Sequence, residues 1–124
     1  MRARQAALAV LCLAAAHGAM AEGAFPRGKL LFLRCASCHD ISQTPSPKIG
    51  PNLAGVFGRR AGSLPGYAYS PAMKAQTFIW DEASLDRWLT KPSAVVPGTA
   101  MAFAGVESPA DRQAIIDYLR TATK

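Results

Sequence analysis

The 124-residue sequence is short of cysteine, histidine and long apolar runs, and each shortage excludes a class of protein. It contains three cysteines and two histidines. Cys35 and Cys38 lie so close together that a disulfide between them would close almost no loop and stabilise little. No apolar run approaches the roughly 20 residues that a membrane-spanning helix needs. Half of the residues are apolar and 18% are charged, a balance that excludes intrinsic disorder.

The first 21 residues have the pattern of a secretory signal peptide. Arg2 and Arg4 precede an apolar stretch at residues 6–16, and Ala19-Met20-Ala21 matches the A-x-A cleavage pattern. We expect cleavage after Ala21, with Ala19 as the neighbouring choice, to leave a domain of residues 22–124. An uncleaved membrane anchor is the alternative, but the apolar stretch is shorter than a span requires.

Removal of residues 1–21 leaves a small domain with few reactive side chains. Cys12 and His17 are lost with the leader, and the net charge falls from +6 to +4 because two arginines leave. The remaining cysteines and the remaining histidine are Cys35, Cys38 and His39. A chain of about 100 residues buries only a modest core, so something other than disulfides must stabilise it.

The patterns in the mature chain predict helices and loops and no convincing strand. Helical spacing of apolar residues predicts a first helix near residues 27–38, and residues 40–69 are rich in proline and glycine and are predicted to be loops. Ser70-Pro71 is typical of a helix start, as is Asp81, whose helix we expect Pro92 to end. Ser108-Pro109-Ala110-Asp111 has a capping-box pattern and begins the last helix. We therefore predict an all-α fold in which short helices and long loops surround something that fills the core.

Three of these helices carry an apolar face. The predicted faces are Gly28, Leu31, Phe32 and Cys35 in the first helix, Leu85, Trp88 and Leu89 after Asp81, and Ile115, Ile116 and Leu119 in the last helix.

The motif Cys35-Ala36-Ser37-Cys38-His39 indicates what fills the core. C-x-x-C-H is the attachment motif of c-type haem, in which two thiols bond to the haem vinyl groups and the histidine binds the iron. A thioredoxin-like thiol pair would need a βαβ context, which the sequence does not show. A zinc site would need four ligands, and the mature chain has no other cysteine or histidine.

The sixth iron ligand must come from a residue other than histidine, because His39 is the only histidine of the mature chain. The candidates are Met73, on the short helix after Ser70, and Met101, in an extended loop rich in proline and glycine. An isolated methionine often serves only packing. We favour Met101, because such a loop can bring a side chain to a haem face, and His/Met ligation raises the reduction potential.

The order and spacing of motifs along residues 24–123 resemble those of class I cytochromes c, in the branch of mitochondrial cytochrome c and bacterial cytochromes c2. The matching segments are Gly28 to His39, Gly50-Pro51-Asn52-Leu53, Gly55 to Arg59, Pro65 to Ser70, Trp80, Pro97 to Gly105, and Ala114 to Leu119. The resemblance implies a fold in which the first and last helices cross and one haem c is attached covalently.

The resemblance also implies roles for individual residues. The backbone carbonyl of Pro51 is expected to accept a hydrogen bond from His39, and Arg59, Tyr69 and Trp80 are expected to hydrogen-bond a buried haem propionate. Departures from the family are Trp88, in place of a tyrosine that contacts the methionine sulfur, and Met73, in place of an asparagine. Ser93, Ala94 and Ala100 stand where mitochondrial members carry lysines.

These observations predict a soluble periplasmic carrier of single electrons that is not itself an enzyme. The alternative is a dedicated haem subunit that accepts electrons from a periplasmic dehydrogenase. The expected partners are redox proteins, namely a membrane oxidase, a cytochrome bc1-type complex or such a dehydrogenase. We expect a monomer, with no nucleic-acid partner and no stable membrane insertion once the leader is cleaved.

Overall fold

The computed structural model describes residues 24–124, and the predicted signal peptide lies outside them. The described chain contains five helices and no strand, which confirms the predicted all-α class. The helices are α1 (Ala24–Ala36), α2 (Pro71–Lys74), α3 (Glu82–Thr90), α4 (Pro92–Val95) and α5 (Pro109–Ala122). None of the helices in this part of the chain is long and apolar enough to cross a membrane.

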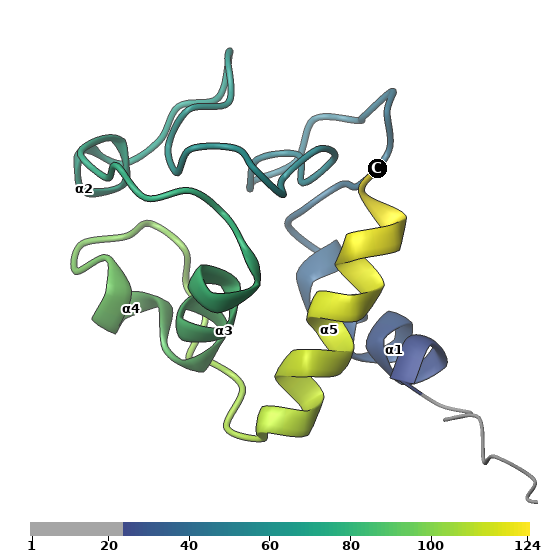
Figure 1. Ribbon diagram of the computed structural model, residues 1–124. Coiled ribbons are helices and arrows are strands. Elements are labelled where there is room, and N and C mark those ends of the chain that lie inside the picture. Colours follow the sequence, from purple (N-terminus) through teal and green to yellow (C-terminus); the bar gives the residue numbers. More distant parts are fainter. Residues whose placement is uncertain (1–23) are drawn as a thin grey trace, which may run out of the picture.

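Helices α1 and α5 form the most extensive helix pair and cross closely (Figure 1). The crossing depends on Gly28, because a Cβ atom there would lie 2.0 Å from the carbonyl oxygen of Ala114 and 2.8 Å from Cβ of Tyr118. Phe32 packs on the Tyr118 ring with 5.4 Å between ring centroids. The absence of a side chain at Gly28 thus sets the distance between the first and last helices.

Helix α3 packs on the other side of α5, and its start is fixed by side chains. The Asp81 carboxylate accepts a hydrogen bond from the backbone N–H of Ser84, and the Ser84 hydroxyl accepts one from the backbone N–H of Asp81. Trp80 and Leu85, on either side of this cap, are both buried in the core. The start of the helix at Asp81 is therefore confirmed.

Two details differ from the sequence prediction. Pro92 follows the end of α3 as expected, but it also begins the short helix α4, because proline is suited to a first helical position. Ser108 caps α5 by accepting a hydrogen bond from the backbone N–H of Asp111. The predicted capping box is not completed, because the Asp111 carboxylate pairs with Arg27 of α1, 2.8 Å from the Arg27 Nε, and so joins the two terminal helices.

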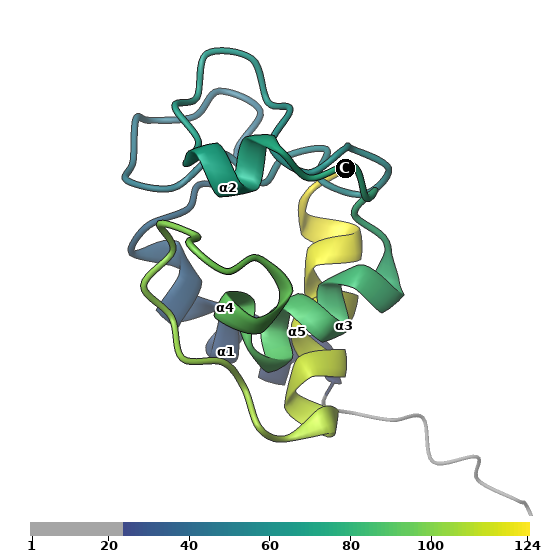
Figure 2. The same cartoon turned by 90° about the vertical axis from the view of Figure 1, so that its left-hand side faces the viewer.

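The segment between α1 and α2 is a series of loops, as predicted (Figure 1). It is attached to the end of α5, since the backbone N–H of Gly55 donates to the carbonyl of Thr123 and the Gln43 amide donates to that of Lys124. Figure 2 shows α2 and these loops on one side and α3 and α4 on the other. Side chains from both sides, and from α1 and α5, surround a central cavity.

Candidate functional site

The central cavity has a volume of about 480 Å³, and every helix except α4 contributes to its wall. All eight residues that the sequence analysis selected line it: Cys35, Cys38, His39, Pro51, Arg59, Tyr69, Trp80 and Met101. Residues separated by more than 60 positions along the chain are therefore brought to one site. The cavity therefore lies at the centre of the domain, among the residues of the hydrophobic core.

His39 is held in one orientation by its neighbours. Its Nδ1 lies 2.7 Å from the carbonyl oxygen of Pro51, and because a carbonyl only accepts, Nδ1 carries the proton. Gly50 lies against the ring, where a Cβ atom would be 2.6 Å from Cε1 and 2.7 Å from Nδ1. The other ring nitrogen, Nε2, is left with its lone pair, which is the form of imidazole that binds a metal ion.

The charge state of His39 also suits a residue that binds a metal ion. Burial lowers the pKa of this imidazole below its usual 6.5, the hydrogen bond to Pro51 opposes that change, and the positive charge of Lys48 adds to it. Metal binding requires the neutral imidazole, so a lowered pKa means that fewer protons must be displaced when a metal ion binds.

Cys35 and Cys38 are free thiols at the end of α1, and both are half-buried at the cavity. A tight turn after the helix places them, since the backbone N–H groups of Cys38 and His39 both donate to the carbonyl of Cys35, at 3.0 and 2.8 Å. Burial raises the pKa of the Cys35 thiol, and the charge of Arg34 opposes the increase. One turn therefore presents two thiols and an imidazole to the same cavity.

Both methionines of the described chain line the cavity. Met73 is on α2 and is only 8% exposed. Met101 is half-buried in the loop between α4 and α5, which we call the Met101 loop (residues 97–108). Its backbone N–H donates to the Thr99 hydroxyl at 3.3 Å. The cavity thus contains two thioether sulfurs and one available imidazole nitrogen.

Polar donors face the cavity near Arg59. Its two terminal nitrogens donate to the carbonyls of Ala54 and Asn52, at 3.2 and 3.0 Å, while its Nε has no partner among residues 24–124. Burial lowers the pKa of this guanidinium, which nevertheless stays charged because the ordinary pKa of arginine lies far above neutral pH. The Trp80 indole N–H, which lines the cavity, likewise makes no hydrogen bond within residues 24–124. An anionic group in the cavity would give both donors an acceptor.

Three further residues of the cavity received no role, or only a comparative one, from the sequence. Trp88 packs edge-to-face on Trp80 with 5.4 Å between centroids, and Tyr67 packs in the same way on Tyr69 at 4.7 Å. Gly50 is needed beneath the His39 ring. The sequence signals for Gly50 were its place directly before Pro51 and in a segment that resembles the family, and contact with a ring eleven positions away cannot be inferred from either.

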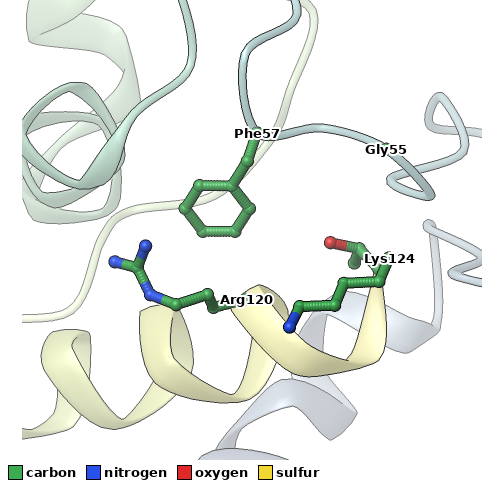
Figure 3. A pocket seen from close by; sticks show the side chains of 5 residues that line it. Gly55, Phe57, Arg120 and Lys124 are labelled. Atoms are coloured by element: carbon green, nitrogen blue, oxygen red, sulfur yellow. The ribbon is translucent and has the colours of Figure 1, made fainter.

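A second, smaller cavity of about 230 Å³ lies apart from this site, between the loop at residues 55–57 and the end of α5 (Figure 3). The Arg120 guanidinium lies 5.1 Å from the centroid of the Phe57 ring, and Arg120 also pairs with Glu82 of α3. These contacts join the last turn of α5 to its neighbours. They involve no residue of the central cavity.

An all-helical domain that presents a C-x-x-C-H motif to an apolar cavity defines a class of small proteins that attach haem covalently. Comparison with known proteins specifies the family. A family model described as Cytochrome c matches residues 25–123. Cytochrome c2 of Rhodomicrobium vannielii is 42% identical over 121 residues, which cover 98% of this chain and 97% of that protein.

Two eukaryotic proteins are similarly related. Cytochrome c of Stellaria longipes is 42% identical over 104 residues, covering 83% of this chain and 96% of that protein. Cytochrome c of Euglena viridis is 48% identical over 96 residues, covering 77% and 93%. The chain belongs to the cytochrome c family. It is therefore a haem-containing electron carrier that exchanges electrons with other redox proteins.

Proposed function

We propose that the protein is a periplasmic carrier of single electrons with one haem c, bound through Cys35 and Cys38 and ligated by His39 and Met101. The observation that carries the proposal is the cavity itself, because two thiols, an oriented imidazole and a thioether line one apolar space of about 480 Å³. Bound there, haem supplies the exchange of one electron between ferrous and ferric iron.

The residues of the chain supply orientation and charge. The hydrogen bond from His39 to Pro51 fixes the tautomer and the ring plane, so that Nε2 points away from the backbone. The unpartnered donors of Arg59 and Trp80, together with the Tyr69 hydroxyl, fit a carboxylate such as a haem propionate. The Tyr69 oxygen accepts from the backbone N–H of Leu64 at 3.2 Å and keeps its own proton to donate.

We propose Met101 as the sixth ligand because its backbone is less constrained than that of Met73. Met73 sits on α2, whose first turn is capped by Ser70, and Gly62 packs so closely on the Met73 carbonyl that its Cβ would lie 2.5 Å away. Met101 belongs to a loop that can adjust to an iron atom without breaking a helix. With His39 and Met101 both bound, no iron position remains for a substrate, which favours a carrier over an enzyme.

The proposed location is the periplasm, with residues 1–21 as a cleaved signal peptide. The match to cytochrome c2 covers 98% of this chain and so includes most of these residues, whereas the match to the Stellaria protein covers 83%. The proposed partners are a membrane oxidase, a cytochrome bc1-type complex or a periplasmic dehydrogenase, met by a monomer. A permanent haem subunit of such a dehydrogenase is the alternative, and it would copurify with that enzyme.

The test is a spectroelectrochemical titration of the haem-loaded protein beside its Met101→Ala and Met73→Ala variants. Met101→Ala should lower the midpoint potential and allow carbon monoxide to bind the reduced iron, because a thioether ligand favours ferrous iron. Met73→Ala should keep the potential close to that of the unaltered protein and should not bind carbon monoxide. The reverse pattern would assign the ligand to Met73.

A further inference from the structure

Arg112 is a buried charged residue that the proposed electron-transfer function does not use. It lies in the first turn of α5, and its side chain is only 11% exposed. The guanidinium donates to three acceptors: Nε to the Asp86 carboxylate at 2.7 Å, and Nη1 to the carbonyls of Val106 and Glu107, each at 2.9 Å. Its donors thus reach α3 on one side and the end of the Met101 loop on the other.

The Met101 loop has few other attachments. Within the described chain, residues 97–105 hydrogen-bond only among themselves and to Val96 at their start. At the far end, the backbone N–H of Val106 donates to the carbonyl of Leu89 at 2.7 Å, and the next contacts are those of Arg112. Gly105 also packs on α3, where a Cβ would lie 2.1 Å from the Thr90 carbonyl. The loop is therefore held at its two ends.

The carbonyl contacts matter more than the ion pair. The Asp86 side chain is 46% exposed, so water can solvate its charge if Arg112 is removed, and half-exposed ion pairs contribute little. The carbonyls of Val106 and Glu107 accept from a charged donor, which is among the stronger kinds of protein hydrogen bond. Their loss would loosen the end of the loop that returns from Met101 and leave it held by the Val106–Leu89 hydrogen bond and the packing of Gly105.

We propose that Arg112 is a positioning residue, which fixes the end of the Met101 loop and thereby keeps the Met101 sulfur in the cavity as a ligand. The inference rests on the proposed ligation by Met101. Only four residues lie between Met101 and Val106, so movement of the loop end is transmitted through a short backbone segment. Arg112 does not line the central cavity, so it acts on Met101 only through the loop.

The experiment measures how readily an added ligand displaces the thioether. Imidazole is titrated into the oxidised, haem-loaded protein while the absorption band of the sulfur–iron bond is followed. The apparent affinity for imidazole is proportional to the fraction of molecules in which the native ligand has left, so it reports on loop opening. Unfolding in guanidinium chloride is measured on the same samples to separate loop opening from general loss of stability.

Arg112→Gln is compared with Arg120→Gln and Asp86→Asn. Arg120 is in the same helix and also pairs with α3, but it lies about two turns away and contacts no residue of the loop. Asp86→Asn removes the ion pair and leaves both carbonyl contacts of Arg112 in place. We expect Arg112→Gln to bind imidazole about tenfold more tightly, as loss of a charged hydrogen bond implies, and both controls to stay within about twofold of the unaltered protein.

Two results would overturn the proposal. One is an unchanged imidazole affinity in Arg112→Gln, and the other is an increase in Asp86→Asn or Arg120→Gln as large as in Arg112→Gln. If Arg112→Gln yields no haem-loaded protein, Arg112→Lys takes its place, because it keeps the charge and loses the planar fork. A sulfur–iron band that persists in Met101→Ala would instead refute the ligand assignment, and the inference with it.

Discussion

Substitution of Gly28 by alanine tests whether the crossing of α1 and α5 controls the stability of this domain. The added methyl carbon would lie 2.0 Å from the Ala114 carbonyl oxygen, a full 1.0 Å inside the 3.0 Å limit below which neighbouring atoms must shift. Both helix backbones would have to separate, because a backbone carbonyl cannot rotate away as a side chain does. The Phe32–Tyr118 contact would loosen with them.

The expected magnitude follows from two opposing effects. Alanine is favoured over glycine in a helix by about 1 kcal/mol. Overpacking of a tight core costs roughly 1–3 kcal/mol, occasionally more, and a clash with backbone atoms falls at the upper end. We therefore expect Gly28→Ala to lower the free energy of unfolding by about 2 kcal/mol, which corresponds to a Tm about 10 °C lower in a domain of this size.

Guanidinium unfolding of the haem-loaded protein, followed by far-ultraviolet circular dichroism, measures the effect. Lys29→Ala, an exposed position in the same helix, should change stability little. Gly66→Ala adds a methyl group at φ +79° where nothing lies within 4 Å, so it isolates backbone strain, about 1 kcal/mol. If Gly28→Ala is as stable as the unaltered protein, or no less stable than Gly66→Ala, the close approach does not limit stability.

Three further predictions concern the haem, the partner and pH. The Cys35→Ala/Cys38→Ala variant without haem should lack a cooperative thermal transition, because so small a helical core cannot offset chain entropy; a transition near that of the haem-loaded protein would contradict this. Electron transfer between the protein and its own oxidase or reductase should slow only weakly with salt, since Ser93, Ala94 and Ala100 carry no charge at positions where mitochondrial members carry lysines. A decrease as steep as that of a mitochondrial cytochrome c measured alongside would refute it. Hydrogen bonds from the Ser84 backbone and hydroxyl hold the pKa of Asp81 below its usual 3.8, so the stability it contributes is present above that value and is lost as pH falls through the lowered pKa. Asp81→Asn should therefore show a weaker loss of stability in acid, and an unchanged acid dependence would argue against the cap.

The sequence predicted the helices well because their ends are locally encoded. Ser70, Asp81 and Ser108 all act as N-caps in the structure, and each needs only the backbone N–H three residues ahead. The short helix α4 was missed because Pro92 was interpreted only as a stop signal. A proline after a helix can end it or begin the next one, and four residues carry no periodicity to distinguish the two.

Non-local features were predicted less well. No sequence pattern indicated a role for Arg112, which is buried and bound to two carbonyls and a carboxylate. Its acceptors come from α3 and from a loop, so no spacing within α5 indicates them. The choice between Met73 and Met101 as sixth ligand is also non-local. Both side chains line the cavity, and their positions in the sequence do not show that they converge.

The thiols at the end of α1 determine whether the protein keeps its bound group when both are diluted. A group held only by contacts leaves its site when its free concentration falls below the dissociation constant, and the stability it provides leaves with it. In a domain whose centre is a cavity of about 480 Å³, that departure would remove much of the interior. Two covalent bonds, at Cys35 and Cys38, would keep the local concentration of the group constant however dilute its surroundings. A protein exported to a compartment with no reserve of the group could then remain folded for as long as those bonds last.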